Sequence, residues 1–359
     1  MGTMEHLRGR QLMKLYQFSR STLLPSAPVV INTSKIQQPS LLPSSLISVV
    51  PCAQISPLYS SKRHSSRPVN EKPSEVRKKV NITTLRKLYK KNEPISVMTA
   101  YDYPSGHALD QAGIEMCLVG DSLAMVALGY SSTNEITVDE MIHHCRAVAR
   151  GVKSAFLIGD MPFGSYEIST QHALQNAIRF MREGRMEAIK LEGGVEMADT
   201  VASITRVGIP VLGHIGLTPQ RTASLGGYRV QGKTIARAKE LLKDALSLQD
   251  AGCFAIVLEA VPAPVASVIT EQLDIPTIGI GAGSGTSGQV LVQLDMLGVY
   301  DKFMPKFCKP YASLAPLIND ALSRYKTEVK ARTFPQAEHT YEMSDGEDIE
   351  AWKKSLMRK

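Results

Sequence analysis

The sequence predicts an α/β protein with a (β/α)8 TIM barrel. From residue 94 onward, short apolar runs rich in β-branched residues alternate with stretches of helical periodicity. The runs are apolar almost throughout, which is typical of parallel strands covered by helices. Eight such units favour a closed barrel over an open sheet. A barrel of roughly 250 residues with tails also fits the 359 residues of the chain.

The predicted strands are the apolar runs 95–101, 116–121, 155–161, 188–192, 210–214, 255–259, 276–280 and 302–307. The last run is short and charged, so it has the weakest pattern. The clearest helical stretches are 137–150, 170–182, 234–251 and 310–327. Thr137 and Glu140 have the spacing of a capping box at the start of the first helix. Gly151, Gly184 and Gly252 follow helical patterns, where a left-handed cap favours glycine.

The basic charge of the chain is concentrated at its beginning. Residues 1–70 contain eight Lys or Arg and one acid, Glu5, so they alone carry +7, the formal net charge of the whole chain. The body is neutral, and we therefore expect no nucleic-acid partner. The leader is also rich in Ser and Thr, a composition typical of a mitochondrial transit peptide, although a generic disordered tail has a similar one.

We therefore expect a mitochondrial protein with three parts: a disordered leader at 1–70, a barrel at 80–342 and a charged extension at 343–359. In the extension, Ile349, Trp352 and Leu356 form a candidate docking stripe. The five cysteines, Cys52, Cys117, Cys145, Cys253 and Cys308, show no paired spacing and are predicted to be reduced, those of the body buried. No run of about 18 uncharged apolar residues is present, so we expect no membrane span.

Polar side chains end one predicted strand after another. They are Asp121 with Ser122, Asp160, Lys190 with Glu192, His214 and Glu259. A single acid after a strand is often only a helix cap. In a barrel, however, the carboxyl ends of all strands meet at one rim, where the active sites of this fold lie. The sequence therefore predicts one site built from these residues.

Asp121, Asp160 and Glu192 offer only carboxylate oxygens, which favours magnesium over a softer metal. A 2-oxo acid could bind such an ion through its carboxylate and keto oxygens, and the ion would stabilise the enolate formed when a proton leaves the adjacent carbon. Lys190 would add positive charge beside the substrate. It could equally form an ion pair with Glu192, which shares its strand face.

Glu259 ends an apolar strand and is a candidate general base, although a structural buried acid is the alternative. His214 has apolar and glycine neighbours and could orient a substrate or simply be a core residue. The polar, Gly-rich connection 215–233 is unusually long and could close over a bound substrate. The glycines of 279–283 have the wrong spacing for a dinucleotide fingerprint, so close backbone packing is their expected role.

Seven motifs in this order resemble the ketopantoate hydroxymethyltransferase family over residues 80–342. They occupy 99–103, 119–123, 159–163, 190–194, 213–220, 226–232 and 279–283. The resemblance implies a barrel of the phosphoenolpyruvate/pyruvate type that transfers a hydroxymethyl group from 5,10-methylenetetrahydrofolate to 3-methyl-2-oxobutanoate, giving ketopantoate and tetrahydrofolate in pantothenate synthesis. It also implies a homo-oligomer, commonly a decamer.

The resemblance further implies a role for each strand-end residue. Asp121 and Asp160 would bind Mg2+, and Glu192 would complete the sphere, directly or through water. Glu259 would accept the proton. The residues that would hold the oxo acid are Asp121, Ser122, Asp160, Lys190 and His214. The resemblance identifies no folate-binding residue.

Two features depart from the family pattern. The segment 130–133 begins Tyr130-Ser131 where many relatives have His-Asp, and residues 343–359 lie beyond the usual end. Two other functions remain open. A magnesium-dependent carbon–carbon lyase of the same superfamily would commonly need a reactive cysteine or a basic cluster, and neither is evident in the loops. A non-catalytic folate-binding barrel would not need the intact set of ionisable residues.

Overall fold

The computed structural model describes residues 77–299 and 304–357. It contains a closed barrel of eight parallel strands, each paired with the next and the last with the first. The strands are β1 (Ile95–Thr99), β2 (Met116–Val119), β3 (Phe156–Asp160), β4 (Ala188–Glu192), β5 (Val211–Gly216), β6 (Ala255–Glu259), β7 (Thr277–Ile280) and β8 (Gly288–Leu291). The predicted fold class is confirmed. The predicted leader lies outside the described residues.

The eighth strand was predicted at the wrong place. It is Gly288–Leu291 rather than 302–307, and residues 304–307 of the predicted run form no strand. The observed strand has no apolar run because it begins with Gly288-Gln289. A side chain at position 288 would clash with the carbonyl oxygen of Ile95 and would lie 2.8 Å from the Ile278 side chain. The tight packing between β1 and β7 therefore selects glycine where the pattern required an apolar residue.

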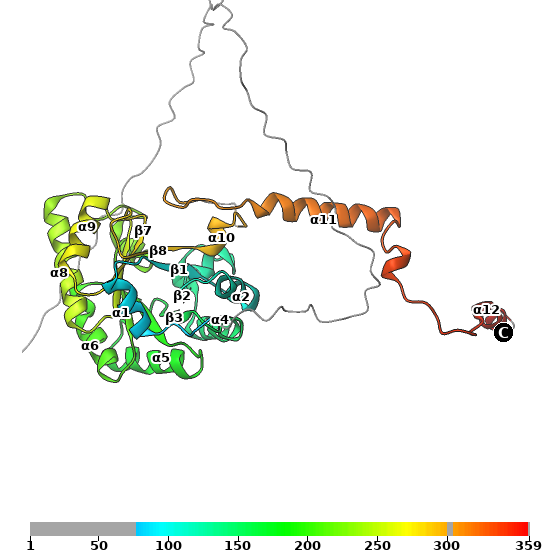
Figure 1. Ribbon diagram of the computed structural model, residues 1–359, viewed down its shortest axis with the longest axis horizontal. Coiled ribbons are helices and arrows are strands. Elements are labelled where there is room, and N and C mark those ends of the chain that lie inside the picture. Colours follow the sequence, from blue (N-terminus) through cyan, green and yellow to red (C-terminus); the bar gives the residue numbers. More distant parts are fainter. Residues whose placement is uncertain (1–76, 300–303, 358–359) are drawn as a thin grey trace, which may run out of the picture. The chain divides into compact units, whose positions relative to one another are not determined.

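Helices surround the strands (Figure 1). The α-helices of the described residues are α1 (Ile82–Lys90), α2 (Tyr103–Gln111), α3 (Leu123–Val126), α4 (Val138–Gly151), α5 (Thr170–Arg182), α6 (Ala198–Arg206), α7 (Thr222–Leu225), α8 (Ile235–Asp250), α9 (Ala263–Gln272), α10 (Gln293–Met296), α11 (Leu314–Ala331) and α12 (Ile349–Leu356), of which α11 and α12 are not among those around the strands. Neither α11 nor α12 contains a buried residue. Within the described residues, no helix combines the length and the apolar character needed to cross a membrane.

The helix ends agree only in part with the sequence signals. The capping box of α4 forms as predicted, since Thr137 N donates to Glu140 Oε2 over 2.9 Å and Glu140 N donates to Thr137 Oγ1. Gly252 is left-handed, with φ of 98°. Gly151 and Gly184 are not, so this part of the prediction was wrong. Gly151 is required by packing instead, because a Cβ there would lie 2.5 Å from the backbone oxygen of Tyr103.

Alternate residues of the strands face two separate apolar clusters. One cluster, which includes Val97, Ile158, Ala188 and Val257, fills the barrel interior, and the other lies between the strands and the helices. Successive side chains of a strand point to opposite faces. Lys190 therefore faces the interior, two residues beyond Ala188. The interior is apolar near the amino ends of the strands and ionisable at their carboxyl ends.

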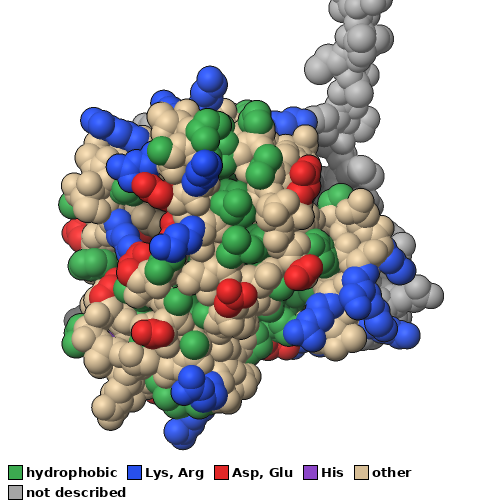
Figure 2. All heavy atoms as spheres, turned by 90° about the vertical axis from the view of Figure 1, so that its left-hand side faces the viewer, with side chains coloured by type: hydrophobic (Ala, Val, Ile, Leu, Met, Phe, Trp, Pro, Cys, Tyr) green, Lys and Arg blue, Asp and Glu red, His purple; other side chains and the backbone are tan. Residues whose placement is uncertain are grey.

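The outer surface carries charges of both signs. Figure 2 shows the side of the molecule where α8 and α9 lie, and there Lys, Arg, Asp and Glu are interspersed with apolar side chains. The four cysteines among the described residues, Cys117, Cys145, Cys253 and Cys308, are buried and free, as predicted. The apolar stripe of α12, which consists of Ile349, Trp352 and Leu356, is exposed. Its role in docking stays a prediction.

Candidate active site

A cavity of about 520 Å³ opens among the carboxyl ends of the strands. Its lining includes all seven ionisable or hydroxyl residues that the sequence singled out: Asp121, Ser122, Asp160, Lys190, Glu192, His214 and Glu259. They lie on or directly after five neighbouring strands, β2 to β6. The strand order, and not proximity along the sequence, thus brings them together.

A buried cation lies beside two buried acids at the floor of the cavity. Lys190 Nζ is 2.6 Å from both carboxylate oxygens of Asp160. The backbone N–H of Asp121 donates to Asp160 Oδ2 over 3.2 Å. Burial raises the pKa of Asp160 to about 7, because it outweighs the lowering effect of Lys190. Burial likewise raises the pKa of Asp121. Burial thus disfavours the charged forms of both carboxyls, and Lys190 offsets this effect only in part.

Burial by itself would lower the pKa of the Lys190 ammonium. The negative charges of Asp160, Asp121 and Glu192 outweigh burial and raise the pKa above its usual value. Lys190 therefore stays protonated at neutral pH. Its contact is with Asp160, so the ion pair with Glu192 that the sequence offered as an alternative is not the one that forms.

Glu192 is turned toward a different set of partners. Its Oε2 accepts the backbone N–H of Gln220 over 3.1 Å, and its Oε1 is buried without a hydrogen-bond partner, 3.4 Å from His214 Nδ1. In the described part of the chain, no group of three or more His, Cys, Asp or Glu side chains is arranged to hold a metal ion. Asp160 accepts the backbone N–H of Asp121, whereas the contacts of the Glu192 carboxylate are with Gln220 and His214.

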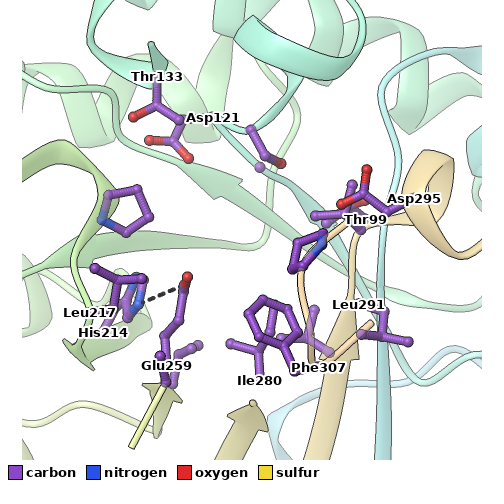
Figure 3. Close-up of a pocket in the computed structure, with 18 of the residues that line it drawn as sticks. Thr99, Asp121, Thr133, His214, Leu217, Glu259, Ile280, Leu291, Asp295 and Phe307 are labelled. Atoms are coloured by element: carbon purple, nitrogen blue, oxygen red, sulfur yellow. Dashed lines mark ion pairs between the residues drawn. The ribbon is translucent and has the colours of Figure 1, made fainter. Parts of the chain in front are cut away.

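His214 lies between two glutamates. Its Nε2 is 3.3 Å from Glu259 Oε2, the contact marked in Figure 3. Burial alone would lower the pKa of His214, but the contacts with Glu192 and Glu259 outweigh burial and raise the pKa to about 9. The Glu259 side chain is 14% exposed, whereas His214 is buried. Glu259 is therefore the more accessible of the two side chains in the cavity, and its contact with His214 holds its carboxylate in place.

Ser122 is held by a hydroxyl chain that the sequence did not reveal. Tyr101 Oη is 3.0 Å from Ser122 Oγ and accepts the Thr99 hydroxyl over 2.8 Å. Burial raises the pKa of Tyr101, so its hydroxyl stays protonated. Thr99 and Tyr101 stand in one of the seven motifs, and the hydroxyl groups at the end of the first predicted strand were the available signal.

Gln220 is a further residue that the sequence analysis missed as part of the site. Its side-chain amide donates to Asp121 Oδ2 over 2.9 Å and to the backbone oxygen of Met161 over 3.0 Å. Tyr166 donates to its amide oxygen. Gln220 belongs to the long connection 215–233, which also supplies Tyr228, Arg229 and Val230 to the cavity lining. This segment therefore both positions an acid and forms a wall.

The wall after β7 and β8 is mostly apolar. Ile280, Leu291 and Phe307 line it, and Asp295 of α10 is the acid among them (Figure 3). Gly281 packs closely here, since a Cβ at this position would lie 2.7 Å from the Phe307 ring. Close packing is the role expected for the glycines of 279–283. Asp295 was not predicted, because it follows the strand that the sequence misplaced.

The family comparison gives one consistent result. A family model described as "Ketopantoate hydroxymethyltransferase" matches residues 79–337. A protein of Emericella nidulans named 3-methyl-2-oxobutanoate hydroxymethyltransferase is 52% identical over 321 residues, which cover 88% of this chain and 92% of that protein. A namesake from Arabidopsis thaliana, designated mitochondrial, is 50% identical and covers 80% of this chain and 86% of its own length.

Similarity extends to bacteria and to solved structures. The Heliobacterium modesticaldum protein of the same name is 52% identical, covering 75% of this chain and 97% of that protein. Among solved structures, phosphonopyruvate hydrolase matches with a TM-score of 0.49 and 12% identity over 78% of this chain and 97% of that chain. A 2,3-dimethylmalate lyase matches with a TM-score of 0.47 and 16% identity over 77% of this chain and 93% of that chain.

Proposed function

The chain belongs to the ketopantoate hydroxymethyltransferase family, and from this membership we propose how its cavity carries out the reaction. The chain is a hydroxymethyltransferase that acts on 3-methyl-2-oxobutanoate in pantothenate synthesis. We propose 5,10-methylenetetrahydrofolate as the one-carbon donor. Its methylene carbon and a water molecule together supply the hydroxymethyl group, and tetrahydrofolate leaves.

The acid pair fits a magnesium site. Asp121 and Asp160 are adjacent and buried, and burial raises their pKa values, so a divalent cation would stabilise their ionised forms. Magnesium typically binds one or two carboxylates and keeps positions for water and substrate. Asp121 and Asp160 would hold it directly, and Glu192 would act through water, since its carboxylate faces His214 and Gln220. When bound, Mg2+ would supply positive charge that stabilises the enolate of the oxo acid.

The side chains around the acid pair would position the oxo acid. Lys190 places a protonated ammonium at the floor of the cavity, where it attracts an anionic substrate. Ser122 offers a hydroxyl held by Tyr101. His214 supports the neighbouring Glu259 and keeps its carboxylate directed at the cavity. The oxo acid would thus lie between the Asp160–Lys190 pair and Glu259.

Glu259 would accept the proton from carbon three of the oxo acid. Its carboxylate lies at the carboxyl end of β6 and reaches the cavity, as a general base must. The electron pair of the broken C–H bond then forms the enolate. Water would open the methylene bridge of the donor, so that both C–N bonds break and tetrahydrofolate and formaldehyde form. Carbon three of the enolate would attack the formaldehyde carbon, and the new alkoxide would take the proton held by Glu259. The placement of Glu259 and the Asp160–Lys190 pair on one cavity is the observation that carries this proposal.

Deuterium exchange tests the proposal without any donor. Purified protein with Mg2+ should exchange the hydrogen on carbon three of 3-methyl-2-oxobutanoate with deuterium from solvent, as followed by NMR. The same sample treated with a chelator should not. If folded, magnesium-loaded protein catalyses no exchange, the proposed enolate chemistry is wrong. Cleavage of a diacid in the absence of folate would instead support a lyase.

We also propose that the protein is mitochondrial and forms a homo-oligomer as large as a decamer. The basic, Ser- and Thr-rich leader supports the first point, together with plant relatives designated mitochondrial. A fluorescent fusion with and without residues 1–70 tests the location, since only the complete chain should enter mitochondria. Analytical ultracentrifugation tests the assembly, and a monomer at micromolar concentration would contradict it.

A further inference from the structure

Asp295 is a buried acid for which the chemistry proposed above gives no role. It lies on α10, directly after β8, and its residue exposure is 7%. Its Oδ1 is buried without a hydrogen-bond partner, and among the described residues no group donates to either oxygen of this side chain. A buried carboxylate oxygen without a donor costs free energy in the folded protein. A ligand that brings N–H groups would remove this cost.

The position of Asp295 separates it from the oxo-acid end of the cavity. Figure 3 shows its carboxylate directed into the cavity, on the side away from His214 and Glu259. Burial raises its pKa to about 6, so the group is mostly ionised at neutral pH. Between the two ends, the lining includes the apolar side chains of Ile280, Leu291 and Phe307. This end therefore has apolar side chains along much of its wall, and Asp295 is its acid; the Thr99 side chain lies beside Asp295, and Lys306 also lines the cavity.

The cavity is large enough for a second molecule. Its volume of about 520 Å³ falls in the range of roughly 300–1,000 Å³ that encloses a drug-sized ligand. A branched five-carbon oxo acid is much smaller than that. The remaining space must admit the one-carbon donor, because its methylene carbon has to reach carbon three of the oxo acid.

We propose that the carboxylate of Asp295 binds the aminopyrimidinone edge of the pterin ring of the folate donor. This inference rests on the proposed function, which requires a folate in the same cavity. The ring nitrogen N3–H and the 2-amino group are neighbouring donors on one edge, and they match the two oxygens of a carboxylate in a bidentate pair. The flat bicycle would lie along the apolar wall that includes Leu291 and Phe307, with its methylene-bearing side toward Glu259.

The variant Asp295→Asn tests this placement. An amide has nearly the same shape, but it offers one acceptor oxygen and an NH2 group that opposes the donors of the pterin. We expect the KM for 5,10-methylenetetrahydrofolate and the Kd for tetrahydrofolate to rise about 10- to 100-fold, as is usual when a charge-assisted pair is lost. Deuterium exchange of the oxo acid, which needs no folate, should stay within about twofold of wild type. Asp274→Asn, an exposed acid outside the cavity, should change neither.

A ligand analogue gives a second test. Tetrahydrofolate without its 2-amino group should bind the wild-type protein at least about tenfold more weakly than tetrahydrofolate itself, and Asp295→Asn should bind the two nearly equally. Equal binding of the two compounds to wild type overturns the inference, as does an unchanged KM for the donor in Asp295→Asn. If the wild-type protein with Mg2+ catalyses no deuterium exchange, the proposed function is overturned instead.

Discussion

The side-chain amide of Gln220 donates to Asp121 Oδ2 over 2.9 Å, and the backbone N–H of the same residue donates to Glu192 Oε2 over 3.1 Å. One residue of the connection 215–233 is thus bonded to two of the three acids proposed to surround the magnesium ion. Tyr166 completes the arrangement by donating to the amide oxygen of Gln220. The position of this connection and the orientation of the acids are therefore coupled.

Gln220→Leu removes the amide while keeping a side chain of similar length. We expect the free energy of unfolding to fall by about 1–3 kcal/mol, because the buried Tyr166 hydroxyl loses its acceptor. Loss of the donor to Asp121 should also raise the Mg2+ concentration needed for half-maximal deuterium exchange. Urea unfolding at one fixed protein concentration measures the first effect. The control is Gln175→Leu, an exposed position of α5; equal effects of the two variants would rule out the coupling.

Glu259→Gln should abolish deuterium exchange, with a loss of about 100-fold or more, because the amide cannot accept the proton. Binding of 3-methyl-2-oxobutanoate in the presence of Mg2+, measured by calorimetry, should persist, since Glu259 lies away from the Asp160–Lys190 pair. Glu183→Gln, an exposed glutamate paired with Arg179 on the surface, serves as the control. Near-normal turnover of Glu259→Gln would show that another group is the base.

Asp160→Asn should have the opposite profile. It removes one of the two adjacent carboxylates, so magnesium-dependent binding of the oxo acid itself should weaken by about tenfold or more. Calorimetric titration with the oxo acid at several Mg2+ concentrations separates a loss of metal affinity from a loss of substrate affinity. Binding that stays as tight and as magnesium-dependent as in wild type would exclude Asp160 as a ligand.

Lys190→Met leaves two buried acids without their cation. Because the side chains of Lys190 and Asp160 are only 5% and 2% exposed, solvent screens their interaction little. Removal of one partner of such a pair typically costs about 3–5 kcal/mol. We expect a loss of this size in urea unfolding at neutral pH. Arg237→Met breaks an ion pair whose side chains are 71% and 59% exposed and should cost less than about 1 kcal/mol. Comparable losses in the two variants would contradict the arrangement.

The sequence predicted the residues whose role follows from their place on a strand. Lys190 and Glu192 end a run that forms β4 with the predicted bounds, and the closed strand order then brings them to the same cavity as Asp160 and Glu259. Gln220 escaped the prediction because its side-chain and backbone partners lie 99 and 28 residues away. Asp295 was not predicted from the sequence for another reason. Close packing requires Gly288 in β8, which removes the apolar run that would have marked the strand before Asp295.

His214 should make the stability of the metal-free protein depend on pH above neutrality. Its pKa is raised from 6.5 to about 9 in the folded protein, so within this window the folded state binds more protons than the unfolded state. The stabilising contribution is complete below about pH 6.5 and is lost as the pH rises toward 9, with a slope of up to about 1.4 kcal/mol per pH unit. Urea unfolding at a series of pH values measures this slope. His214→Gln cannot titrate there, and its slope should be shallower. A variant as steep as wild type would mean that another group is responsible for the pH dependence.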